Sequence, residues 1–221
     1  MQPLLFKEWL KLRPFWLLAL IGNGLLMLYM WIDIRHGFSV EHAEMIYYQA
    51  NQIGRLFYED LRYAPLLTGA ALAVAQFVPE VNKGRMRLSM HLPINLAALT
   101  LTYLIIGLGS VLVVLFLNGA GLYAIIATYF PREFADSAIS TAMPWLMAGV
   151  VAYLGATMTL LEPRRGRQVF SLSVSLGLVW LFHLTGSFSQ YNEVIWGLGL
   201  LTVLMIPAVL LPVYRFRYGG L

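Results

Sequence analysis

The chain contains no cysteine and very little charge. Only 12% of its 221 residues are Asp, Glu, Lys or Arg, whereas an ordinary soluble domain carries about 25%. The absence of cysteine excludes a disulfide framework and a thiolate metal site. Hydrophobic residues make up 59% of the chain, which is more apolar surface than one soluble domain of this size can bury. This composition predicts an integral membrane protein, because lipid then covers the surplus apolar surface.

Motifs for catalysis and nucleotide binding are also missing. The sequence has no Gly-x-x-x-x-Gly-Lys-Ser/Thr phosphate loop, so the chain cannot bind ATP in that manner. His36, Glu41, His42 and Glu44 share one segment but lack an established metal-ligand spacing. Asp33 is the only acid in a predicted span and lies at its edge, which disfavours an ion-coupled carrier. We therefore predict no catalytic residue, no metal site and no cofactor in this chain.

A helix needs about 20 apolar residues to cross the hydrocarbon layer of a membrane. Six segments are suitable: residues 14–34, 61–78, 94–117, 141–161, 169–188 and 194–213. The first is too long for the apolar part of a signal peptide, and no cleavage site follows it. The sequence therefore predicts an all-α, polytopic membrane protein with six transmembrane helices in a single domain, residues 1–221.

Asn, Gly, Ala and Gly at residues 118–121 predict a break after the third span. The uncharged stretch continues to residue 130, but residues 122–130 are too few to cross the membrane. We expect them to form a re-entrant or interfacial piece.

Small residues repeat every four positions in two of the spans. Gly69 and Ala73 do so in the second span, and Ala148, Ala152 and Ala156 do so in the fourth. Small side chains let helices approach closely. We expect these residues to mark contacts between helices of the same chain.

Lys and Arg alternate between the two sides of this arrangement. Cytoplasmic segments of membrane proteins carry the excess of cations. With the N-terminus inside, the inner segments hold most of them: Lys7, Lys11, Arg13, Lys83, Arg85, Arg87, Arg164, Arg165, Arg167, Arg215 and Arg217. The outer segments hold Arg35, Arg55, Arg62 and Arg132. We therefore expect an N-in, C-in protein of a bacterial cytoplasmic (inner) membrane, with lipid and no nucleic acid as a partner.

The first segment, residues 1–13, is amphipathic. Its apolar face is formed by Leu5, Trp9 and Leu12. Its charged residues lie opposite: Lys7, Glu8 and Lys11. This pattern predicts an interfacial helix that lies in the headgroup plane before the first span, or a simple anchor.

The outer residues 35–62 also show a helical repeat of apolar residues. The repeat consists of Ile46, Ala50, Ile53, Phe57 and Leu61. We interpret it as an external amphipathic segment that rests on the outer leaflet. An external gate or a helix that docks a partner is the alternative.

The inner loop over residues 79–93 has a distinctive order. Glu80 follows the membrane exit, Gly84 comes four residues later, and Leu92 and Pro93 open the next span, where proline suits a first helical turn. The loop could form a short helix parallel to the membrane that presents its residues to a cytoplasmic partner: Glu80, Lys83, Gly84, Arg85, Met86 and Arg87. Its charges could instead serve only to fix the topology.

This layout resembles the ABC-2 type permease family, the membrane subunits of ATP-binding-cassette exporters. The resemblance rests on six spans, an amphipathic N-terminal helix, both ends inside, and an inner loop of the form Glu-x-x-x-Gly followed by Leu-Pro, here Glu80, Gly84, Leu92 and Pro93. In that family the loop is the coupling helix that docks on the ATPase. The resemblance therefore implies an ATP-binding-cassette ATPase subunit and a second permease copy or related permease subunit as partners.

We accordingly expect a permease subunit that moves a substrate with energy from a separate ATPase. Three alternatives stay open. The chain could be a non-transporting scaffold or assembly subunit, a substrate-binding membrane component of an importer, or a membrane enzyme without a recognisable motif.

Overall fold

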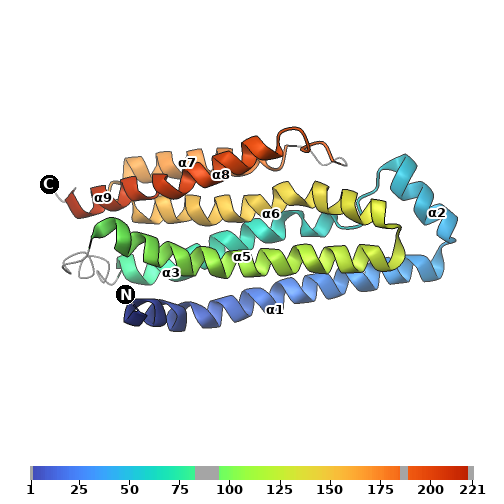
Figure 1. The fold of residues 1–221 in the computed structure, drawn as a ribbon, viewed down its shortest axis with the longest axis horizontal. Coiled ribbons are helices and arrows are strands. Elements are labelled where there is room, and N and C mark those ends of the chain that lie inside the picture. The colour runs from blue at the N-terminus through green and yellow to red at the C-terminus, as the bar shows by residue number, and fades with distance from the viewer. Residues whose placement is uncertain (1, 83–94, 185–188, 219–221) are drawn as a thin grey trace.

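The computed structural model describes residues 2–82, 95–184 and 189–218, and all regular structure within them is helical (Figure 1). In chain order the elements are α1 (Gln2–Val40), α2 (Ala43–Tyr48), the π-helix η1 (Gln49–Ile53), the 3-10 helix η2 (Glu59–Tyr63), α3 (Ala64–Asn82), α5 (Leu96–Tyr129), α6 (Arg132–Leu161), α7 (Arg165–Leu181), α8 (Ile195–Ala208) and α9 (Leu210–Tyr218). The prediction of an all-helical protein is confirmed for this part of the chain.

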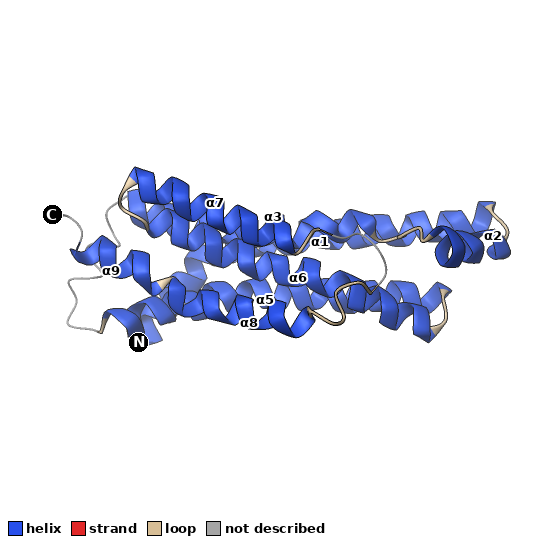
Figure 2. Cartoon of the chain, turned by 90° about the horizontal axis from the view of Figure 1, so that it is seen from above, coloured by secondary structure: helices blue, strands red, loops and turns tan. Residues whose placement is uncertain are grey.

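The long helices form an elongated bundle, and α1 begins and α9 finishes at the same end of it (Figures 1 and 2). We call this the terminal end of the bundle and the opposite one the distal end. α3 finishes and α5 begins at the terminal end, whereas α1 is joined to α2, and α5 to α6, at the distal end (Figure 1). α6 is central, because it contacts α3, α5, α7, α8 and α9.

Five helical stretches of the described residues are long and apolar enough to cross a membrane. They are Leu5–Val40, Glu59–Asn82, Leu96–Tyr129, Arg132–Leu161 and Ile195–Arg217. They overlap every predicted span except the fifth, residues 169–188. α7 overlaps that segment and has 17 residues, slightly fewer than the usual 20. The helical, membrane-embedded character is therefore confirmed, and the sixth crossing stays a prediction.

The expected break at residues 118–121 is wrong. α5 continues without interruption from Leu96 to Tyr129, so residues 122–129 extend a helix and form no re-entrant piece. Asn118 is buried and donates from Nδ2 to Asn23 Oδ1 at 2.7 Å, while Asn23 donates to Thr68 Oγ1 at 2.9 Å. Because neighbouring helices satisfy the Asn118 amide, it does not compete for the backbone of its own helix.

Aromatic side chains pack the distal part of the bundle. α7 and α8 end short of the distal end (Figure 1), which leaves α1, α5, α6 and the α2 segment to build it. Phe130 lies at the centre of this packing, with its ring centroid 4.6–5.7 Å from those of Phe38, Tyr47, Phe57 and Phe134. At these spacings aromatic pairs are favourable, so the rings hold the distal segments together.

The helical repeat predicted on residues 35–62 is confirmed in part. Ile46 and Leu61 are buried, but Ile53 is exposed. The helix breaks at Gly54, whose φ of +73° lies in the left-handed region that favours glycine. Ile53 itself ends the π-helix η1, whose wider turn moves it off the face that Ile46 and Ala50 share.

α3 and α6 meet backbone to backbone at glycine. A Cβ added to Gly69 would overlap the carbonyl oxygen of Gly149, and a Cβ added to Gly149 would lie 2.7 Å from the Pro65 carbonyl oxygen. The prediction that Gly69 marks a contact within the chain is confirmed. On α6, the contact falls on Gly149, next to the predicted Ala148.

Candidate functional site

Of the predicted coupling residues, Glu80 lies within the described part of the chain. It belongs to the last turn of α3 and its side chain is fully buried. The other predicted coupling residues lie outside the described part of the chain: Lys83, Gly84, Arg85, Met86 and Arg87. The contacts of Glu80 with the neighbouring helices therefore define the candidate site.

Two buried carboxylates share one ammonium group at the terminal end. Lys11 Nζ of α1 lies 3.0 Å from Glu80 Oε1 and 2.6 Å from Glu8 Oε2. Both glutamate side chains are fully buried, and that of Lys11 is 16% exposed. The second oxygen of Glu80, Oε2, accepts no hydrogen bond within the described residues. We call these three residues the Lys11 cluster.

The structure of residues 1–13 differs from the amphipathic interfacial helix that the sequence predicts. These residues form the first turns of α1 and no separate helix. Glu8 is buried together with Leu12, although the two residues were assigned to opposite faces. A buried carboxylate is costly without a cation, and the orientation of α1 provides Lys11 for Glu80.

The Lys11 cluster is a strong tether between α1 and α3. The two buried glutamates share the single ammonium group of Lys11. Removing one partner of a buried ion pair typically costs about 3–5 kcal/mol, because the remaining charge is then uncompensated. Relative movement of the two helices at this point is therefore unfavourable.

A second polar layer lies one helical turn from Glu80 and adds α5 and α6. Gln76 Nε2 donates to the Tyr103 carbonyl oxygen at 2.9 Å, and the Tyr153 hydroxyl donates to Gln76 Oε1 at 2.7 Å. Lys11 Nζ lies 5.8 Å above the Tyr103 ring, within the range of a cation–π contact. The end of α3 is thus tied to three other helices.

Another buried acid closes the terminal end of α6. The carboxylate of Glu162 is almost fully buried, and Arg215 Nη1 of α9 donates to its Oε2 at 3.2 Å. The Arg215 side chain is half-exposed, so this pair is screened more strongly by water than the Lys11 cluster. It fixes the last turn of α9 to the end of α6.

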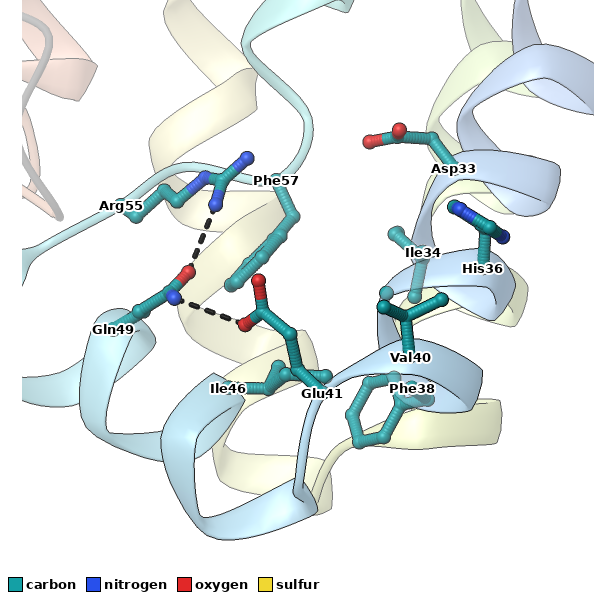
Figure 3. A pocket seen from close by; sticks show the side chains of 11 residues that line it. Asp33, Ile34, His36, Phe38, Val40, Glu41, Ile46, Gln49, Arg55 and Phe57 are labelled. Atoms are coloured by element: carbon teal, nitrogen blue, oxygen red, sulfur yellow. Dashed lines mark hydrogen bonds between the residues drawn. The ribbon is translucent and has the colours of Figure 1, made fainter.

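A pocket of about 250 Å³ opens at the distal end, between α1 and the segment formed by α2, η1 and residues 55–57 (Figure 3). Gln49 holds its charged groups in place: Arg55 Nη1 donates to Gln49 Oε1 at 2.8 Å, and Gln49 Nε2 donates to Glu41 Oε2 at 3.0 Å. Asp33 points into the pocket from α1, opposite Arg55 and Phe57 (Figure 3). Apolar side chains, among them Phe38 and Phe57, complete the lining.

His183 joins the end of α7 to the start of the α3 segment. Its Nε2 lies 3.0 Å from the Arg62 carbonyl oxygen, and Arg62 Nη2 donates to the His183 carbonyl oxygen at 2.6 Å. The imidazole also stacks on the Tyr63 ring with centroids 5.4 Å apart. This reciprocal contact gives the buried histidine a structural role.

Sequence reasoning placed Glu80 at the site but did not identify its partners Glu8 and Lys11. One feature of the sequence could have indicated them. Glu8, Glu80 and Glu162 are the only acids in the cation-rich inner segments, and a buried acid needs a cation beside it. The two ends of the bundle differ: buried ion pairs join helices at the terminal end, and a pocket lined by both charged and apolar side chains lies at the distal end. No protein family, curated protein or solved structure matches this chain.

Proposed function

We propose that the chain is the membrane-spanning permease subunit of an ATP-binding-cassette exporter, similar to the ABC-2 type permeases. A separate ATPase subunit supplies the energy, and two copies, or one copy and a related permease subunit, enclose the path of the substrate. The observation that carries the proposal is the Lys11 cluster, which anchors Glu80 at the start of the inner loop.

A loop that receives force from an ATPase must be rigidly connected to the spans that it moves. Glu80 connects the start of the loop to α1 through Lys11. Gln76, one turn away, connects the same helix to α5 and α6. A push on residues 83–93 is therefore transmitted to four helices together, as coupled transport requires.

We expect ATP hydrolysis to lose its stimulation by the permease in Glu80→Arg and in Gly84→Pro. The first change places a second cation beside Lys11, and the second removes a backbone N–H and fixes φ within the loop. The measurement is ATP turnover of the co-purified ATPase in lipid vesicles, with and without the permease. Turnover in both variants should fall to that of the ATPase alone.

The control is Glu44→Gln, which changes an exposed acid outside the terminal end and should leave stimulation intact. Thermal unfolding of each purified variant separates loss of coupling from loss of folding. Normal stimulation in both loop variants would remove the coupling assignment, and a co-purifying partner without a nucleotide site would favour a scaffold.

The topology proposed with this function has six spans and both termini in the cytoplasm of a bacterial cell. The absence of cysteine allows labelling of single introduced cysteines without background. With a membrane-impermeant maleimide, Glu193→Cys should react in intact cells, whereas Arg165→Cys should react only after permeabilisation. Labelling of both from the same side would show that α7 does not cross the membrane.

A further inference from the structure

An apolar groove of about 550 Å³ lies between the first turns of α1 and the first half of α5. α1 contributes Leu5, Phe6, Trp9 and Trp16, and α5 contributes Ile105, Ile106, Gly109, Ser110 and Val113. The two indole rings are 5.3 Å apart, and Trp16 Nε1 donates to the Ser110 carbonyl oxygen at 3.1 Å. Since the Trp16 donor is used in this way, its ring is held as an apolar wall of the groove.

Gly109 leaves this groove open. A Cβ added to Gly109 would meet no atom within 4 Å, whereas a Cβ added to Gly107 would overlap the Tyr153 hydroxyl and Gln76 Oε1. The two glycines therefore serve different purposes. Gly107 allows close packing of α5 in the core, and Gly109 provides space at the surface.

The surroundings of the groove identify its occupant. Both walls belong to helical stretches that are long and apolar enough to cross a membrane, so lipid chains surround them. An apolar surface alone does not select among lipids, because every acyl chain offers the same methylene groups. Selection must come from a charge at the headgroup level.

Arg13 supplies that charge. It follows Trp9 by four residues and precedes Trp16 by three, and side chains at these spacings share one face of a helix. Arg13 is exposed, and no ion pair within the described residues involves it. Lys11 is engaged by Glu8 and Glu80, and Lys7 is two residues from Trp9, a spacing that does not place side chains on one helix face. The exposed cation on the face of Trp9 and Trp16 is therefore Arg13. A guanidinium group matches the geometry of a phosphate.

We propose that this groove binds an acyl chain of an anionic phospholipid, whose headgroup carries a net negative charge that pairs with Arg13. The lipid then covers Trp9, Trp16 and Gly109 and fills the space between α1 and α5. This site does not depend on the transport function proposed above, since it requires only the groove and the adjacent cation.

The test is quenching of tryptophan fluorescence by brominated lipids in reconstituted vesicles. Brominated phosphatidylglycerol should bind the groove about fivefold more tightly than brominated phosphatidylcholine, because one basic residue near a membrane surface contributes that much to anionic lipid binding. In Arg13→Gln the preference should fall to about one while quenching by both lipids persists. Equal binding of the two lipids by the unchanged protein would overturn the proposal.

Gly109→Leu is the sharper variant, because its side chain fills the groove without meeting any atom near its Cβ. Quenching by both lipids should decrease in this variant. The matched control is Gly22→Leu on α1, where a Cβ also meets nothing within 4 Å, and its quenching should equal that of the unchanged protein. Undiminished quenching in Gly109→Leu would exclude the groove as the lipid site. A change in the oligomeric state of Gly109→Leu would instead assign the groove to an interface between copies.

Discussion

Gly69→Leu is expected to lower the free energy of unfolding by about 3 kcal/mol or more, the upper range for inserting volume into a packed core. The new Cβ would overlap the backbone carbonyl oxygen of Gly149, and a backbone atom cannot move aside as a flexible side chain can. α3 and α6 would have to separate along their contact. Since proteins are stable by only about 5–15 kcal/mol, much of the folded protein should be lost.

Thermal unfolding in detergent and the yield of monodisperse protein in size-exclusion chromatography measure this effect. Gly22→Leu serves as the control again, because leucine is a better helix former than glycine and position 22 is open. It should match the unchanged protein or exceed its stability. Equal melting temperatures for Gly69→Leu and the unchanged protein would show that α3 and α6 do not pack as closely as described.

Lys11→Met is expected to destabilise the protein by about 3–5 kcal/mol, since it leaves two fully buried carboxylates without their ammonium group. Methionine keeps much of the length and apolar character of the lysine stem, so the loss reports mainly on charge. Lys11→Arg preserves the charge and should retain most of the stability. The free energy of unfolding of each purified variant is the measurement.

A combined variant tests whether charge is the cause. In Lys11→Met with Glu8→Gln and Glu80→Gln, no charge is left buried, and replacing a complete buried ionic group by uncharged residues is often close to neutral. Stability should therefore recover by several kcal/mol relative to Lys11→Met alone. A combined variant as unstable as Lys11→Met would mean that packing of the lysine stem, not its charge, holds α1 against α3.

Hydropathy was sufficient to predict most of the helical architecture, because a run of apolar residues long enough to cross a membrane has few other stable structures in lipid. It failed at residues 118–121, where local composition suggests a turn. The Asn118 amide is satisfied by Asn23, which is far away in the sequence, and no local pattern indicates that contact.

The candidate site was predictable only in outline. Glu80 could be singled out because it follows a span, but its pairing with Lys11 joins residues that are 69 positions apart. Gly107 and Gly109 are a second case in which the sequence does not reveal the environment of a residue. They look alike in the sequence, yet one faces the Tyr153 hydroxyl and the other faces an empty groove. Only the rotation of α5 against its neighbours distinguishes them.

Because α5 is uninterrupted, it connects the terminal end of the bundle directly to the distal end. Its 34 residues correspond to a rod about 51 Å long, whereas the hydrocarbon layer is about 30 Å thick. One end begins just after the loop that follows Glu80, and the other leads into the rings around Phe130. If α5 tilts as a rigid rod by about 5° about its start, its end near Phe130 moves by about 4 Å. This displacement exceeds the distance between two atoms in contact. Under the proposed coupling, such a tilt would rearrange the side-chain packing around Phe130.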